Sequence, residues 1–261
     1  MDIVLIGSGN VATHLGTSLQ AAGHRIVQVY SRTKEHAEAL ASLLQSHGVI
    51  SATNRMSDLN LQADLYIIAV SDRAIQSVIT ALPQALQGIV VHTSGSTPIT
   101  VFEDCPHPHG VFYPVQTFSS AKSVDFRLVP LALEASSEQV YGMLEEVGQQ
   151  LSDRVFACSS SQRLAIHIAA VFACNFTNYL YAIGEDVLQA EGLDFDLIRP
   201  LIQETAEKIQ QHSPNRVQTG PAHRNDQVIV QRHINYLADR DQAQLKELYE
   251  LISTLITQKA L

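Results

Sequence analysis

The sequence is short of cysteine and of positive charge. Only three cysteines, Cys105, Cys158 and Cys174, occur among 261 residues, and their spacing fits neither a disulfide framework nor a metal motif. The 17 Lys and Arg are outnumbered by 26 Asp and Glu, which gives a formal net charge of −9. Nucleic acids and anionic membranes are bound through clustered Lys and Arg, so neither is expected as a partner. The cysteines indicate a reducing compartment, and we expect a cytoplasmic protein.

Long apolar runs are also missing. No uninterrupted run reaches the ~20 residues that a membrane-spanning helix needs. The first apolar strand pattern begins at residue 2, so we expect no signal peptide. With 46% hydrophobic and 16% charged residues, the chain can nevertheless bury a full core. Its length allows one large domain or two of ordinary size.

The strongest motif lies at the start of the chain. An apolar run over residues 3–6 leads into the pattern Gly-x-Gly-x-x-Ala, after which apolar residues recur with helical spacing. Gly7 would allow a tight turn, Gly9 would let a pyrophosphate approach the backbone, and Ala12 would let the helix pack closely on the strand. The helix N-terminus would offer free N–H groups to that pyrophosphate. We therefore predict a dinucleotide site, the alternative being a strand followed by a flexible turn. The predicted contacts are Gly7, Ser8, Gly9, Asn10 and Val11.

One absence bears on the choice of dinucleotide. No carboxylate lies between Asp2 and Glu35, whereas an NAD-binding domain carries an acidic residue for the ribose 2′-hydroxyl after its second strand. Arg32 and Lys34 stand there instead, and a 2′-phosphate favours such cations. The sequence therefore predicts NADP, although a solvated basic turn is the alternative. The predicted contacts of this part of the cofactor are Ser31, Arg32 and Thr33.

Residues 1–157 alternate between strand and helix patterns. We predict strands at 25–30, 49–52, 63–70, 88–91, 128–133 and 154–157, with helices at 34–47, 73–82 and 137–151. This alternation is typical of an α/β fold with a parallel sheet, here a Rossmann dinucleotide-binding domain. Ligands of such sheets bind beyond the carboxyl ends of the strands. The further cofactor contacts predicted on that basis are Val70, Ser71, Asp72, Thr93 and Ser94.

Residues 158–261 contain only helix patterns, and we predict a helical substrate and dimerisation domain. A long helix over 159–189 is apolar around most of its circumference, so it must be buried in a bundle core or in a dimer interface. Further helices are expected at 194–211, 226–238 and 241–258. We expect a homodimer formed through this domain.

This order of domains resembles the 6-phosphogluconate dehydrogenase-like superfamily. That superfamily includes pyrroline-5-carboxylate reductase and the deazaflavin-dependent NADP oxidoreductases. The chain is more closely similar to bacterial proteins that pair a Rossmann-like domain with a C-terminal domain of unknown function. The motifs that carry the resemblance lie at residues 7–12, 69–72, 92–96, 112–118, 167–175 and 219–221.

The resemblance implies an NADP-dependent oxidoreductase that transfers hydride to or from a small C=O or C=N group. A non-catalytic NADP-binding regulator is the alternative. His167 stands near the position of the superfamily's proton-donating Lys and can act as an acid or base near neutral pH; a structural core histidine is the other interpretation. The superfamily's Asn would lie one turn later, where this chain has Val171. Asn175 lies two turns later, about 12 Å along the axis, and both His167 and Asn175 are predicted as catalytic.

The same resemblance implies substrate contacts. The turn at 219–221 corresponds to a carboxylate-binding turn of pyrroline-5-carboxylate reductase, and Arg224 could add a charged fork. The alternative is an ordinary turn followed by an N-cap at Asp226. The predicted substrate contacts are Gln116, Thr219, Gly220 and Arg224.

Residues 97–127 are predicted to be an irregular loop that closes over the nicotinamide, since long loops in compact domains are usually functional. Every second residue of an extended segment faces the same side, so zinc could be bound within it by Cys105, His107 and His109. Their spacing, however, matches no standard zinc site. We therefore predict no metal.

Overall fold

The computed structural model describes residues 1–45, 48–119, 122–240 and 242–260. By compactness the chain divides into two units, Met1–Tyr179 and Leu180–Leu261. The sequence prediction placed the domain boundary at residue 157, where the strands end. The compact first unit extends further, through the first two thirds of the long helix.

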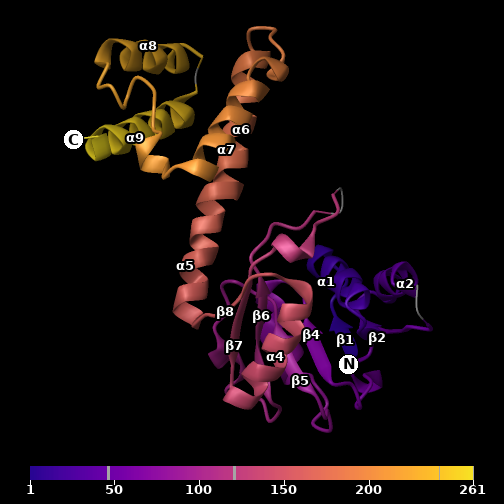
Figure 1. Ribbon diagram of the computed structural model, residues 1–261. Coiled ribbons are helices and arrows are strands. Elements are labelled where there is room, and N and C mark those ends of the chain that lie inside the picture. The colour runs from indigo at the N-terminus through magenta and orange to yellow at the C-terminus, as the bar shows by residue number, and fades with distance from the viewer. Residues whose placement is uncertain (46–47, 120–121, 241, 261) are drawn as a thin grey trace. The chain divides into compact units, whose positions relative to one another are not determined.

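The first unit is built on an eight-stranded sheet (Figure 1) with the order β3-β2-β1-β4-β5-β6-β7-β8. Neighbouring strands are parallel except for β6 and β7, which are antiparallel. The predicted α/β class with a Rossmann N-terminal domain is confirmed. The strands are β1 (Asp2–Ile6), β2 (Arg25–Tyr30), β3 (Ser51–Thr53), β4 (Leu65–Ile68), β5 (Ile89–His92), β6 (His109–Pro114), β7 (Leu131–Ala135) and β8 (Val155–Ala157).

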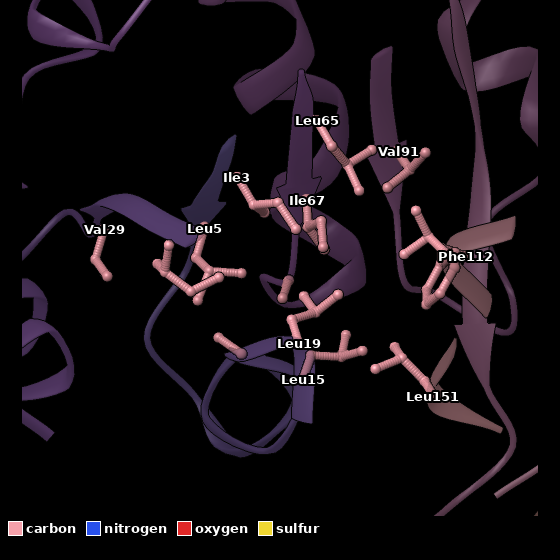
Figure 2. Close-up of a cluster of buried hydrophobic side chains, with 14 of the residues drawn as sticks. Ile3, Leu5, Leu15, Leu19, Val29, Leu65, Ile67, Val91, Phe112 and Leu151 are labelled. Atoms are coloured by element: carbon pink, nitrogen blue, oxygen red, sulfur yellow. The ribbon is translucent and has the colours of Figure 1, made fainter. Parts of the chain in front are cut away.

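Helices cover both faces of this sheet, which explains why its central strands are apolar throughout. Alternate residues of β1 enter different cores: Ile3 and Leu5 pack with α1, α2 and α4 (Figure 2), whereas Val4 and Ile6 pack with α3. The carboxyl ends of β1, β4 and β5 are therefore fixed by two buried layers. The helices are α1 (Asn10–Ala21), α2 (Lys34–Leu43), α3 (Asp72–Thr80) and α4 (Glu138–Leu151). The last residues of the predicted helix 34–47 lie outside the described residues.

Strand β6 contradicts the prediction of an irregular segment over residues 97–127. Its residues are buried from Gly110 to Pro114 and pair with β5 on one side and β7 on the other. Prolines at 106, 108 and 114 hide the strand in the sequence, because proline removes the ladder N–H and normally argues against a strand. The consequence is that residues 115–118 leave a fixed sheet strand at the same edge as the glycine turn.

The predicted long helix is present as one continuous element, and Ser159 and Gln162 form a capping box at its start. It consists of α5 (Ser160–Ala170), a π-helical turn (Val171–Phe176) and α6 (Thr177–Gln189). The remaining predicted helices also form. They are α7 (Arg199–Gln211), α8 (Gln227–Ala238) and α9 (Ala243–Ala260).

Candidate functional site

The turn between β1 and α1 has the geometry of a dinucleotide-binding turn. Gly7 has φ of +124°, and a Cβ at this position would lie 2.2 Å from the carbonyl oxygen of Ala69, so only glycine fits. A Cβ on Gly9 would meet no atom within 4 Å, which leaves its backbone open to a ligand. Ala12 is fully buried in the core. The N-terminus of α1 has no side-chain cap and no acidic residue in its first turn, so its N–H groups can bind phosphate oxygens.

A cavity of about 550 Å³ lies beside this turn and is lined by Ser8, Ser31, Arg32 and Thr33. Ser8 and Ser31 share a hydrogen bond of 3.0 Å between their hydroxyl oxygens. The sequence prediction placed all four residues at the cofactor. It also placed Lys34 near the 2′-phosphate, but Lys34 does not line the cavity and pairs with Glu38 at 3.5 Å.

Two residues that the sequence motifs do not identify line the same cavity. His36 comes from α2 and Arg73 from α3. Together with Arg32 they gather two guanidinium groups and an imidazole around one space, which is the charge that a 2′-phosphate needs. The signal for Arg73 was its place directly after Asp72, at a strand end already predicted to bind cofactor.

A second cavity, of about 560 Å³, adjoins the carboxyl ends of β4, β5 and β6. It brings together most of the remaining predicted site residues of the first unit. Those that line it are Gly9, Asn10, Val11, Val70, Ser71, Asp72, Thr93, Ser94, Gln116, His167 and Asn175. The segment after β6 is held against α1, because the side-chain amide of Asn10 donates to the carbonyl of Phe118 at 3.1 Å. The prediction that the loop closes over this site therefore fits residues 115–118.

The π-helical turn accounts for Asn175. In an uninterrupted α-helix, a residue eight positions after His167 would point about 80° away from it. A π turn has i→i+5 hydrogen bonds and rotates less per residue, which reduces this offset. His167 and Asn175 accordingly line one cavity, together with Cys174. Such turns occur frequently at functional sites. The catalytic roles of both residues stay predictions.

Arg163 ties the long helix to the loop after β5. Its side chain is buried, its Nε donates to the carbonyl of Ser94 at 3.1 Å and its Nη2 to that of Thr97 at 2.6 Å. Its other nitrogen forms an ion pair with Glu134, and Glu134 also accepts hydrogen bonds from Ser160. Nothing in the sequence pattern marks this residue, because a charged side chain in a helix is usually solvated. It positions the helix turn that precedes His167.

Two further side chains at these strand ends are buried. Burial lowers the pKa of His92 to about 3, so its imidazole is neutral and its Nδ1 accepts the backbone N–H of Ser94 at 3.2 Å. Burial raises the pKa of Tyr113 above its ordinary value, which keeps the phenol protonated at neutral pH. Tyr113 lines the cavity of His167 and was not predicted from the sequence.

Three of the predicted substrate residues, Thr219, Gly220 and Arg224, belong to the second unit. Thr219 and Gly220 line an apolar cavity of about 740 Å³ within their own unit. Arg224 is exposed. Asp226 caps α8 by accepting the N–H of Ile229 at 3.3 Å, as the alternative interpretation expected. The substrate contacts of this turn stay a prediction.

The histidines of the Cys105 segment are engaged elsewhere. His107 is buried, and the ring of His109 bonds the carbonyl of His107 at 2.9 Å and stacks on Phe102. Among the described residues, no group of three or more His, Cys, Asp or Glu is arranged to hold a metal ion. This end of β6 is not part of the cavity lining, so the prediction that the segment covers the nicotinamide does not extend to Cys105, His107 and His109.

Two family models match the chain. Residues 2–94 match the family described as NADP oxidoreductase, coenzyme F420-dependent, and residues 129–256 match a domain of unknown function, DUF2520. These two matches confirm the resemblance stated from the sequence. No protein of curated function matches the chain.

Solved structures resemble the whole chain. A protein from Bacteroides fragilis, provisionally assigned as an NADP oxidoreductase, is 41% identical with a TM-score of 0.87, and the match covers 98% of both chains. A protein from Thermotoga maritima is 22% identical, with a TM-score of 0.73 over 99% of this chain and 98% of that one. An imine reductase from Myxococcus stipitatus, solved with NADP+, is 14% identical, with a TM-score of 0.70 over 99% and 93%. The latter two share the fold.

Proposed function

Because the chain belongs to the NADP oxidoreductase family of the Bacteroides protein, we propose that it transfers hydride between NADP(H) and a small C=O or C=N substrate. The predicted cofactor, NADP, is that of the family. The observation that carries the proposal is the cavity in which the glycine turn, the ends of β4 and β5, and His167 meet. A proton donor beside a nicotinamide site is what such a reduction requires.

The residues of the chain have separate roles in binding the cofactor and in transferring the proton. The N–H groups of α1 and the open backbone of Gly9 bind the pyrophosphate, while Arg32 and Arg73 bind the 2′-phosphate. When bound, the reduced nicotinamide supplies the hydride. His167 supplies the proton that the reduced oxygen or nitrogen takes up.

The lining of the cavity also bears on the substrate. Among the described residues, no Lys or Arg lines it, and Asp72 is its only carboxylate. A substrate carboxylate would find no guanidinium or ammonium group there, so the cavity favours an uncharged carbonyl or imine.

Replacing the imidazole of His167 tests the reaction. His167→Gln should lower the turnover of NADPH with ketones or imines by about 10²–10⁴-fold, the range of general acid catalysis. NADPH affinity should change by no more than about 0.5 kcal/mol, because the amide is neutral and of similar size. Steady-state rates, cofactor titration and thermal melts should be measured together, with the exposed His212→Gln as the matched control.

The same measurements separate the alternatives. A regulator would show no turnover in either protein, and NADPH would instead alter the binding of a partner. A structural histidine would lose stability while turnover per folded molecule stayed unchanged. Unchanged turnover in a folded His167→Gln variant would remove His167 from the mechanism.

We further propose that the protein is a homodimer formed through the long helix. Its large apolar side chains recur every four residues and are exposed in the protomer: Leu164, Ile168, Phe172 and Phe176 are 41%, 49%, 63% and 51% exposed. Rows at this spacing form the ridges by which helices interdigitate. Around a two-fold axis such a row packs against its own copy. The row avoids the residues that line the cavity, so both surfaces can function at once.

The same helix, Ser160–Gln189, is long and apolar enough to cross a membrane, with a mean hydropathy of 1.3 over its best window. We propose a second copy of the chain as its cover instead of lipid. Its first turns are fixed to the sheet unit through buried Arg163, and the net charge of −9 disfavours anionic membranes. Together with three free cysteines, this supports a cytoplasmic location.

A further inference from the structure

Tyr113 lies at the carboxyl end of β6 and faces the cavity of His167. Its side chain is only 8% exposed. Among the described residues, no side-chain hydrogen bond is recorded for its hydroxyl or for the imidazole of His167. The hydroxyl oxygen of Tyr113 is not among the fully buried unpaired polar atoms and Tyr113 lines the cavity, so the hydroxyl is available to a ligand there.

Gly95 leaves room for both polar groups at this end of the cavity. A Cβ on Gly95 would lie 2.9 Å from the hydroxyl oxygen of Tyr113 and 2.9 Å from Nδ1 of His167. The hydroxyl oxygen and the ring nitrogen therefore both lie close to the position that a Cβ of residue 95 would occupy. Any side chain at position 95 would have to displace them. The backbone of Gly95 itself has no positive φ. Its lack of a side chain therefore makes room for the pair.

Two other tyrosines of the first unit, Tyr66 and Tyr141, show what a structural hydroxyl can do. Buried Tyr66 donates to the carbonyl of Asn60 at 2.6 Å and accepts the N–H of Ala63 at 3.2 Å. Tyr141 on α4 bonds Glu145 at 3.3 Å. In contrast, the hydroxyl of Tyr113 faces open space beside an acid–base group. A purely structural role would be served equally by phenylalanine.

We propose that Tyr113 is a second catalytic residue of this cavity, whose hydroxyl donates first a hydrogen bond and then its proton to the substrate oxygen or nitrogen. The proposal rests on the oxidoreductase function proposed above. When the C=O or C=N bond is reduced, its electron pair passes to the heteroatom, which takes the proton as the O–H bond of Tyr113 breaks. His167 passes its proton to the phenolate and is itself reprotonated from solvent, so the proton assigned above to His167 reaches the substrate through Tyr113.

The surroundings fit this role. The groups that face the phenol are Asp72 from α3 and Arg163 and His167 from α5. Burial and Asp72 raise the pKa of Tyr113, and Arg163 lowers it in part. The phenol is thus protonated in the resting state, and the nearby guanidinium helps to stabilise the phenolate that forms.

The test uses a binding measurement besides activity. Isobutyramide is an unreactive amide whose carbonyl oxygen accepts hydrogen bonds as a substrate carbonyl would. Calorimetry with NADPH-saturated protein should show isobutyramide binding that Tyr113→Phe weakens about 5- to 10-fold, the value of one hydrogen bond. Gly95→Ala should weaken it similarly by displacing the pair. Tyr141→Phe, which removes a hydroxyl outside the cavity, should leave it unchanged.

Turnover and stability complete the test. With a reducible substrate, Tyr113→Phe should lower kcat about 10²-fold, while NADPH affinity and the melting temperature stay near those of the parent. Equal amide binding in Tyr113→Phe and parent, or no amide binding by the parent, would overturn the proposal. Amide binding that depends on Tyr113 in a protein that reduces nothing would instead refute the oxidoreductase function and leave Tyr113 as a ligand contact only.

Discussion

At the scale of single residues, Arg32 offers the sharpest test of cofactor choice. Arg32→Ala should weaken NADPH binding by roughly 1.5–3 kcal/mol, the range for a hydrogen bond to a charged group. NADH binding should hardly change, because NADH lacks the 2′-phosphate. Calorimetry with both cofactors measures this difference. Lys34→Ala is the matched control, since Lys34 pairs with Glu38 outside the cavity. Equal losses for the two cofactors would contradict the assignment of Arg32.

The sequence predicts the place of Arg32 at the cofactor but not those of Arg73 and His36, for a physical reason. Arg32 lies at a fixed distance after the glycine turn, so strand spacing alone predicts its place. Arg73 and His36 reach the same cavity from two different helices, and only the packing of those helices on the sheet brings them there. Tyr113 could not be predicted either, because it belongs to strand β6, which its prolines make hard to recognise in the sequence.

At the scale of elements, Arg163 joins α5 to the loop after β5. Arg163→Met should lower the free energy of unfolding by about 3 kcal/mol, because it leaves Glu134 without its buried partner and frees two backbone carbonyls. Urea unfolding of the variants measures this loss. Adding Glu134→Leu to Arg163→Met should recover part of it, since no unpaired charge remains. An Arg163→Met protein as stable as the parent would show that the pair is not needed to hold the loop.

Most elements were predictable, since apolar strands bounded by glycine and capped amphipathic helices carry local signals. The structure confirms a mostly parallel sheet, the long helix and the three helices after it. It corrects β6, whose burial between β5 and β7 outweighs its prolines. The π turn could not be predicted either. It inserts one extra residue into the helix, and the spacing of apolar residues in the sequence does not reveal such an insertion. That turn is what brings Asn175 to the cavity of His167.

At the scale of the whole molecule, the exposed row on the long helix predicts a dimer. Light scattering at micromolar concentration should give about twice 28.6 kDa. The double variant Ile168→Glu/Phe172→Glu should be monomeric, because it places like charges opposite each other across the two-fold axis. Circular dichroism should show unchanged helix content.

Leu128→Glu is the control for this experiment, since Leu128 is apolar and 78% exposed but lies outside the long helix. It should remain dimeric. A monomeric parent protein would contradict the proposal, and recovery of the parent with neutral lipid vesicles would indicate that lipid covers the row.

The π turn also affects how relatives of this chain should be aligned. A helix with one residue fewer between Val171 and Phe176 could continue as a regular α-helix and still deliver a side chain to the same point in space. Its residue equivalent to Asn175 would then stand one position earlier in the sequence. An alignment without a gap would pair that residue with Cys174. A side chain that both proteins place at the same point would then be counted as a substitution. Across this segment, equivalent residues of related proteins are therefore better identified by superposing the helices than by counting residues from His167.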